Sequence, residues 1–395
     1  MKLSINKDST IFCLIMFIFL EPALFQQLTM IDNIFVFGKL FAGIYVISVC
    51  LLLNSRKISV AQIIVIIFFG SFVITTALAD GNIFSAIRTV AFNALTVVYL
   101  DYCIRKNCNK YIKLLLQLFI VYATINFILL LIFPNGFGQY VPGYSMTEDS
   151  RLNFLGRDNT FIYFFITAII VAFIHGSKKE LYYILALSFI TMVYVFSATG
   201  IIGCILIVIY ALFLQGKSID KLFNFKILSV AYVIIYYLIV IERIQEKFSY
   251  IIVDILGKDI TFTGRTSLWD SAMSYISQKP WTGYGVTEKF LTTASGIAYS
   301  PHNLILQILL AGGILSLGIF IVMYWICGRK LNYKKYHLSN TIAVAIFIYL
   351  ITSLTESTLN TPYLYVLLIF AYNVGIISNG QATQLKMYFV RSKQC

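Results

Sequence analysis

The chain has 395 residues, of which 59% are hydrophobic and only 12% charged. Soluble domains carry about 25% charged residues, so this composition excludes an ordinary soluble domain and indicates an integral membrane protein. The net charge of +13 would also suit a nucleic-acid partner, so its meaning depends on where the charges lie.

The apolar residues are grouped in long runs. A membrane-spanning helix needs about 20 mostly apolar residues, and twelve segments approach that length: 11–28, 34–53, 60–79, 83–103, 112–133, 159–175, 181–196, 199–215, 227–241, 303–327, 341–355 and 363–378. The first run follows Lys2 and Lys7 as in a signal peptide, but no small-residue cleavage site follows it, so we expect a retained helix. These segments predict an all-α polytopic membrane protein with about twelve transmembrane helices, forming a single membrane domain over residues 1–395.

Lysine and arginine are unevenly divided between the two sides of this predicted bundle. One set of alternate loops holds most of the 30 basic residues, and cytoplasmic loops carry such an excess. We therefore predict that both termini are cytoplasmic. The positive charge is then a topology signal, and we expect no nucleic-acid partner.

Two connections on the opposite, outer side are long: a first outer loop at 134–158 and a large outer loop at 242–302, between the ninth and tenth predicted helices. Loops longer than about 12–15 residues are usually functional or disordered. Within the large loop, one apolar stripe recurs at helical spacing and comprises Leu268, Trp269, Ala272, Met273 and Ile276. This spacing predicts an amphipathic helix on the membrane face, with Arg265 in its first turn near the headgroups.

After Pro280 the same loop reads "WTGYG", which places Trp281 and Tyr284 beside flexible glycines. Aromatic faces next to a polar loop suit contact with sugar rings. They are equally typical of the aromatic belts found at membrane interfaces without any ligand.

The segment "SPHNLILQ" places His302, one of three histidines, at the start of the tenth apolar run. Ser300 is a good N-cap and Pro301 suits the first helical position, so we expect His302 in the first turn of a helix. The helix dipole would keep its ring neutral, and hence able to accept a proton, beside N–H groups that can hold an anion. The alternative is a histidine that only caps the helix at the interface.

Four arginines are predicted near the same outer face. Arg88 lies within the fourth span, where a charge is costly and suggests function unless its side chain reaches the interface. Arg151 and Arg157 flank "LNFLG" before the sixth span, and Arg265 lies in the large loop. Because the guanidinium fork matches phosphate oxygens, several arginines around a neutral histidine would suit a lipid pyrophosphate and an activated hydroxyl.

No metal or cofactor site is expected. The seven cysteines lack metal-type pairing and are expected to be inert thiols. The sequence contains no recognisable nucleotide site, glycine-rich phosphate loop or acidic metal cluster.

The stretch "GRTSLWDSAMSYISQKPWTGYGVTEKF", followed by "SPHNLILQILLAGGILSLGIF", resembles bacterial O-antigen polymerases and ligases, the Wzy-like proteins. It contains their G-R-x-x-x-W helix, P-x-x-G-x-G turn and H-N-x-x-L-Q motif between Gly264 and Phe320. The resemblance implies a GT-C-like, metal-independent glycosyltransferase of the bacterial inner membrane that acts on undecaprenyl-pyrophosphate-linked glycans. It further implies that Arg265 and His302 are the catalytic pair.

In that family an arginine of the earlier outer loop is also a functional residue. It corresponds best to Arg151 here, with Arg157 as the competing choice. Relatives have another arginine where this chain has Thr199, so one phosphate contact is missing, and Arg88 is a candidate to replace it. We assign Arg151, Arg157, Arg88, Asn303, Trp281 and Tyr284 to substrate binding.

The resulting hypothesis is a polymerase that joins lipid-linked repeat units into O-antigen or capsular polysaccharide at the outer membrane face. The alternatives are an O-antigen ligase that transfers polymer to lipid A core and a lipid-linked oligosaccharide flippase. The expected partners are lipid-linked glycans and membrane lipids, with a chain-length regulator and a flippase as possible protein partners.

Overall fold

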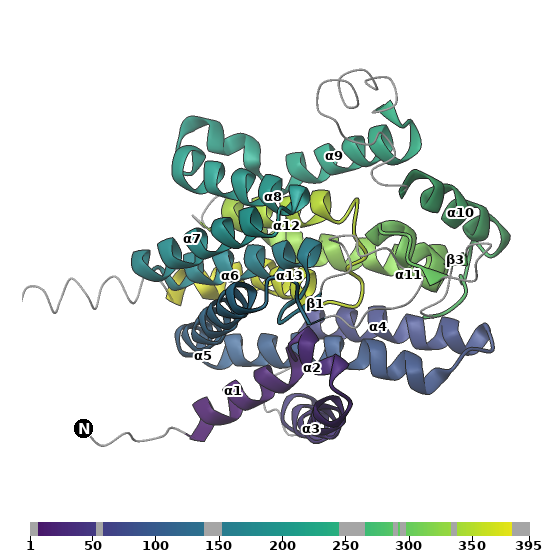
Figure 1. Ribbon diagram of the computed structural model, residues 1–395, viewed down its shortest axis with the longest axis horizontal. Helices are drawn as coiled ribbons and strands as arrows, with labels where there is room; N and C mark the ends of the chain where they lie inside the picture. The colour runs from purple at the N-terminus through teal and green to yellow at the C-terminus, as the bar shows by residue number, and fades with distance from the viewer. Residues whose placement is uncertain are drawn as a thin grey trace, which may run out of the picture.

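The computed structural model describes residues 7–52, 58–137, 152–244, 265–286, 291–292, 298–332 and 338–380. This part of the chain is a bundle of helices with two short hairpins (Figure 1). The α-helices are α1 (Lys7–Phe19), α2 (Ala23–Gln27), α3 (Thr29–Ile47), α4 (Val60–Leu78), α5 (Ile83–Ile132), α6 (Phe161–His175), α7 (Lys178–Tyr194), α8 (Ala198–Ile209), α9 (Phe225–Tyr236), α10 (Arg265–Gln278), α11 (Leu304–Gly328), α12 (Ser339–Thr352) and α13 (Tyr363–Tyr372). The antiparallel hairpins pair β1 (Leu152–Asn153) with β2 (Gly156–Arg157), and β3 (Leu291–Thr292) with β4 (Ala298–Tyr299).

Every apolar segment predicted from the sequence is helical over most of its described residues, although segment 11–28 is divided between α1 and α2. The 50-residue α5 contains two predicted spans and is broken between them at Asn107, whose backbone is non-helical (φ −160°, ψ 88°). An unbroken helix of that length would extend about 75 Å, more than twice the roughly 30 Å hydrocarbon core. A second break bends α13 by 72° from the following helix, Val374–Gly380.

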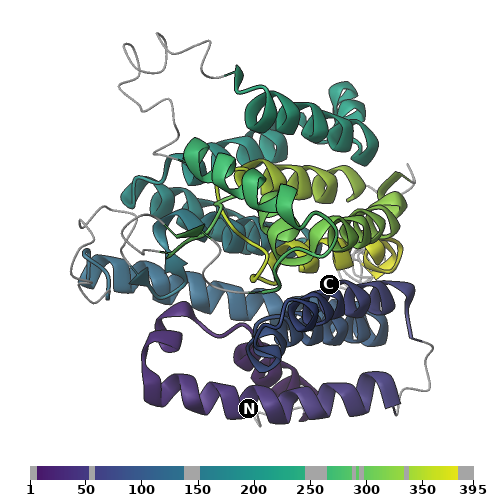
Figure 2. The same ribbon diagram turned by 90° about the vertical axis from the view of Figure 1, so that its right-hand side faces the viewer.

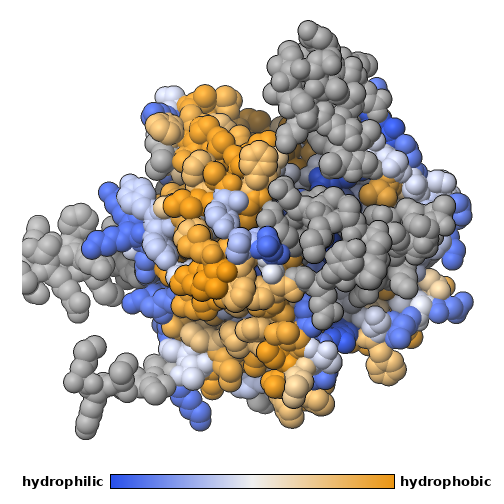
Figure 3. All heavy atoms as spheres, viewed as in Figure 1, coloured by the Kyte–Doolittle hydropathy of each residue, from blue (hydrophilic) through white to orange (hydrophobic). Residues whose placement is uncertain are grey.

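The surface and the helix lengths are those of a multi-pass membrane protein. Among the described residues, five helices are long and apolar enough to cross a membrane, or six if the bent pair at α13 is one span. Peripheral α3 exposes large apolar side chains, including Met30, Phe37 and Phe41, and lies at the edge of the bundle in both ribbon views (Figures 1 and 2). Hydrophobic residues form a band across the face in Figure 3, with hydrophilic residues toward both ends. Twelve crossings and a GT-C-like arrangement stay predictions.

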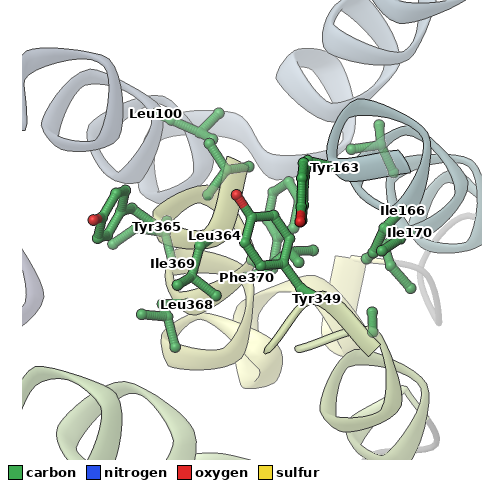
Figure 4. Packing of buried hydrophobic residues seen from close by; sticks show 14 of the residues in the cluster. Leu100, Tyr163, Ile166, Ile170, Tyr349, Leu364, Tyr365, Leu368, Ile369 and Phe370 are labelled. Carbon is green, nitrogen blue, oxygen red and sulfur yellow. The ribbon is translucent and has the colours of Figure 1, made fainter. Parts of the chain in front are cut away.

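The core lies where α6, α12 and α13 meet the middle of the bundle. The rings of Tyr163 on α6 and Tyr349 on α12 are fully buried, with centroids 4.7 Å apart (Figure 4). The Tyr349 hydroxyl hydrogen-bonds the Thr361 hydroxyl at 3.0 Å. This packing fixes the link between α12 and α13, which carries part of the site described below.

Helix α11 is interrupted at Gly313, which has φ 63° and ψ −165°. The interruption frees backbone groups that would be costly to leave unsatisfied in a membrane. The turn Pro280–Gly285 supplies their partners: Tyr284 and Gly285 N–H donate to the carbonyls of Leu310 and Ala311 at 2.7 and 3.0 Å, while Ile314 and Leu315 N–H donate to the carbonyls of Pro280 and Trp281 at 2.8 and 3.3 Å. The P-x-x-G-x-G motif therefore forms a turn whose backbone hydrogen-bonds the groups that the break in α11 leaves unpaired.

Replacing Gly313 with alanine should destabilise the protein strongly. The backbone conformation is one that side chains rarely adopt, and a Cβ would lie 2.2 Å from the Trp281 carbonyl oxygen. We expect a loss of roughly 2–5 kcal/mol from strain and overpacking, measured as a lower unfolding temperature in detergent. Gly318→Ala on the same helix is the matched control, because its Cβ would meet nothing within 4 Å. An equal loss of stability in both variants would contradict the close packing of the turn against Gly313.

Candidate active site

Three side chains from distant parts of the sequence meet at one end of the bundle. Arg265 begins α10, His302 precedes α11, and Glu356 lies in the link between α12 and α13. Arg265 Nη2 lies 2.6 Å from Glu356 Oε1, and His302 Nδ1 lies 3.3 Å from Glu356 Oε2. One buried carboxylate thus holds both residues that the sequence predicts as the catalytic pair.

The H-N-x-x-L-Q motif joins the start of α11 to the segment that carries Glu356. The Asn303 side chain caps α11 by accepting from Leu306 N–H at 3.0 Å, and its amide donates to the Leu354 carbonyl at 3.1 Å. Leu304 N–H donates to the Ser353 carbonyl, and Gln307 Oε1 accepts from Leu359 N–H, both at 3.1 Å. His302 and Glu356 are therefore held in register by the backbones on either side of them.

The predicted helix start at Ser300 and Pro301 is wrong. The N-cap is Asn303, and the Ser300 hydroxyl instead contacts the Ser357 hydroxyl. His302 lies before the first turn in a left-handed conformation (φ 45°), so the helix-dipole argument for its neutral ring does not apply in the form predicted. Left-handed backbone costs a non-glycine residue about 1–2 kcal/mol, and such strain is concentrated at functional sites.

Helix α10 covers the predicted apolar stripe and packs against other helices. Trp269 and Ala272 are fully buried and pack with Leu306 and Leu310 of α11 and with Val240. The apolar stripe thus faces protein rather than lipid. This packing fixes the first residue of the helix, Arg265, against Glu356.

The geometry suits proton transfer at His302. A carboxylate against Nδ1 favours the tautomer with its proton on Nδ1, leaving the Nε2 lone pair to accept another proton. The ring is accessible, with 31% of the side chain exposed, whereas the Glu356 side chain is only 9% exposed. Substrate can therefore approach the imidazole but not its orienting carboxylate.

The other predicted arginines are not brought into this cluster. Arg88 pairs with Asp32 of α3 at 2.9 Å and is largely exposed, so its charge is already matched outside the site. Arg157 lies exposed on β2, and Arg151 lies outside the described residues. Thr199 lies in the first turn of α8.

Two of the three remaining predicted contact residues, Asn303 and Tyr284, make contacts within the protein. Asn303 is fully buried, and the hydrogen bonds above use both ends of its amide to join α11 to the α12–α13 link; its contact with substrate stays a prediction. Tyr284 packs edge-on against Tyr275, lies under Lys279 and donates its hydroxyl to the Tyr275 carbonyl. Trp281 is 64% exposed.

The sequence does not single out Glu356 as a candidate site residue. It stands in "SLTESTLNTP" at the end of an apolar run, where it reads as one more loop charge. The signal that could have found it is an acid bracketed by hydroxyl residues at the mouth of a span, where a buried carboxylate needs a basic partner.

No group of three or more histidine, cysteine, aspartate or glutamate side chains within the described ranges could hold a metal ion. The described cysteines are free, and five of the six are buried.

Glycine at position 302 should separate stability from activity. Because the backbone there is left-handed, we expect His302→Gly to be more stable than His302→Ala by about 1 kcal/mol, while both lack the imidazole and are inactive. Unfolding temperatures in detergent, measured beside a glycan assay, check this. Equal stability of the two variants would contradict the strain at His302.

Part of the chain is similar to known proteins. Residues 183–321 match the family model described as O-antigen ligase. A general O-oligosaccharyltransferase from Acinetobacter baylyi is 27% identical over 126 residues, which are 29% of this chain and 21% of that protein. The chain thus matches about a fifth of the length of this curated relative.

The helices and the surface define a multi-pass membrane protein. Within it, residues 183–321 are similar to the O-antigen ligase family, as the motifs predicted. That matched segment includes Arg265 and His302 but not Glu356.

Proposed function

We propose that the protein is a glycosyltransferase that uses a lipid-pyrophosphate-linked glycan as donor at the outer face of the bacterial inner membrane. The observation that carries the proposal is the shared carboxylate: Glu356 contacts both Arg265 and His302, uniting an anion-binding group with a potential base. The O-antigen ligase family match and the oligosaccharyltransferase relative support the same class of reaction.

In this proposal His302 is the general base. Its Nε2 takes the proton of an acceptor hydroxyl as the oxygen bonds to the anomeric carbon of the donor sugar, with inversion. Glu356 stabilises the imidazolium that forms, an arrangement typical of base–orienter pairs. No metal or cofactor takes part in these steps.

Arg265 neutralises the leaving pyrophosphate. As the anomeric C–O bond breaks, its electron pair goes to the phosphate oxygen, and a fixed guanidinium stabilises that growing charge. The Glu356 contact uses Nη2, one of three guanidinium nitrogens, so the planar fork can still address phosphate oxygens. Arg151, with Arg157 as the alternative, remains the proposed second arginine, and exposed Trp281 the proposed sugar contact.

We favour a polymerase that extends O-antigen or capsular chains on undecaprenyl pyrophosphate, with a chain-length regulator and a flippase as proposed partners. The description of the matched family supports the second candidate, an O-antigen ligase. The two reactions share the donor and differ in the acceptor: a lipid-linked repeat unit or lipid A core.

Complementation separates the two acceptors. The gene is expressed in polymerase-null and ligase-null hosts of the same serotype, and glycan length is read on gels, with the His302→Ala variant as the control. A ladder restored only in the polymerase-null host supports the polymerase. A ladder restored only in the ligase-null host would show that the protein is a ligase and not a polymerase. If neither host is restored, both proposed functions are contradicted.

A further inference from the structure

A cavity of about 480 Å³ lies at the opposite end of α11 from His302. It is lined by Ser59 before α4, Arg105 of α5, Lys330 after α11, and Tyr372 and Asn373 at the bend after α13, among others. Because α11 has 25 residues between these two ends, the cavity is separate from the site at Arg265, Glu356 and His302.

The polar wall of this cavity is preorganised around a buried carboxylate. Asp101, fully buried, accepts from Arg105 Nε and the Ser59 hydroxyl at 2.9 Å each, and from the Asn373 amide at 2.7 Å. The Arg105 guanidinium also donates to Gln62 Oε1 at 3.0 Å. These bonds hold Arg105 at the cavity wall and match its charge with that of Asp101.

Lys330 supplies the second cation. Its ammonium lies 3.5 Å from the ring centroid of Tyr372, and over the described ranges no ion pair joins it to a carboxylate. Among the described residues, the cavity lining contains two cations and no acid, and Asp101 behind it offsets only one of them. The site therefore has a net positive charge and suits an anion.

We propose that this cavity binds the phosphate of an anionic phospholipid headgroup. It lies where α4 begins, α5 is broken at Asn107, and α11 and α13 end. This is the side that the basic loops predict to be cytoplasmic, and basic pockets between transmembrane helices at that depth bind anionic headgroups. Lys330 and Arg105 contact the phosphate oxygens, and the Ser59 and Asn373 side chains line the wall beside them. Inorganic phosphate presents the same oxygens without the acyl chains.

Native mass spectrometry of the delipidated full-length protein tests the proposal, with phosphatidylglycerol, phosphatidylcholine and inorganic phosphate as separate probes. We expect phosphatidylglycerol to bind at least about fivefold more tightly than phosphatidylcholine, and Lys330→Gln to reduce that binding about five- to tenfold, as loss of a charge-assisted hydrogen bond would. Lys330→Arg should retain binding. Lys217→Gln, which removes an exposed loop lysine, should leave it unchanged.

Equal binding of the two lipids, or equal effects of Lys330→Gln and Lys217→Gln, would overturn the site. If Lys330→Arg also lost phosphatidylglycerol binding, the positive charge at position 330 would not be what binds the phosphate. Inorganic phosphate that binds at Lys330 without competing with phosphatidylglycerol would overturn the lipid as the source of the phosphate.

Discussion

Replacing His302 with alanine should abolish the glycan product while the protein still reaches the membrane in normal amount. The variant removes the base from the proposed reaction, and general acid–base catalysis contributes about 10²- to 10⁴-fold. Product is measured on glycan gels from cells that express the variant as their sole copy, and protein by immunoblot of membranes.

His175→Ala is the matched control for that experiment. His175 also lies beside a glutamate, with Nε2 3.4 Å from Glu180, but it ends α6 and does not contact Arg265 or Glu356. It should retain product, so loss in both variants would point to a general folding defect. A normal amount of glycan product in His302→Ala would rule out His302 as the general base.

Replacing Arg265 with alanine should destabilise the fold as well as remove activity. The side chains of Arg265 and Glu356 are only 13% and 9% exposed, and removing one partner of a buried pair costs about 3–5 kcal/mol, because the other charge stays buried and uncompensated. Adding Glu356→Gln should recover most of that stability, since it removes the orphaned charge. Activity should stay lost in the double variant.

Arg88→Ala is the control for the stability measurements on Arg265→Ala and the double variant, because Arg88 forms an ion pair with Asp32 but is 60% exposed. Exposed pairs contribute about 0–1 kcal/mol, so its unfolding temperature in detergent should change little. If the double variant were no more stable than Arg265→Ala, the buried pair would not be the cause of the loss.

The helices were predictable from sequence because apolar runs of membrane length have one stable outcome. Their ends were less predictable. Ser300 and Pro301 form a good local helix start, yet tertiary hydrogen bonds from Asn303 to the α12–α13 link moved the start to Leu304. The two predicted spans within α5 are likewise separated by a break at Asn107.

The resemblance named Arg265 and His302 together, and the structure places both against one carboxylate, but the sequence did not indicate that carboxylate. Glu356 lies 54 residues from His302 and 91 from Arg265, and no local pattern connects them. The exposure of Arg88 and the internal hydrogen bonds of Asn303 likewise follow from packing. Residue type alone therefore could not predict which of these side chains lie beside Glu356.

The central claim is that Arg265, Glu356 and His302 act together on a lipid pyrophosphate. It is tested most directly by incubating the purified full-length protein with an undecaprenyl-pyrophosphate-linked repeat unit and measuring release of undecaprenyl pyrophosphate together with the lengthened glycan. We predict release by the wild type and a reduction of about 100-fold or more in Glu356→Gln and His302→Ala, with Arg88→Ala unaffected. Release by Glu356→Gln at the wild-type rate would contradict the account.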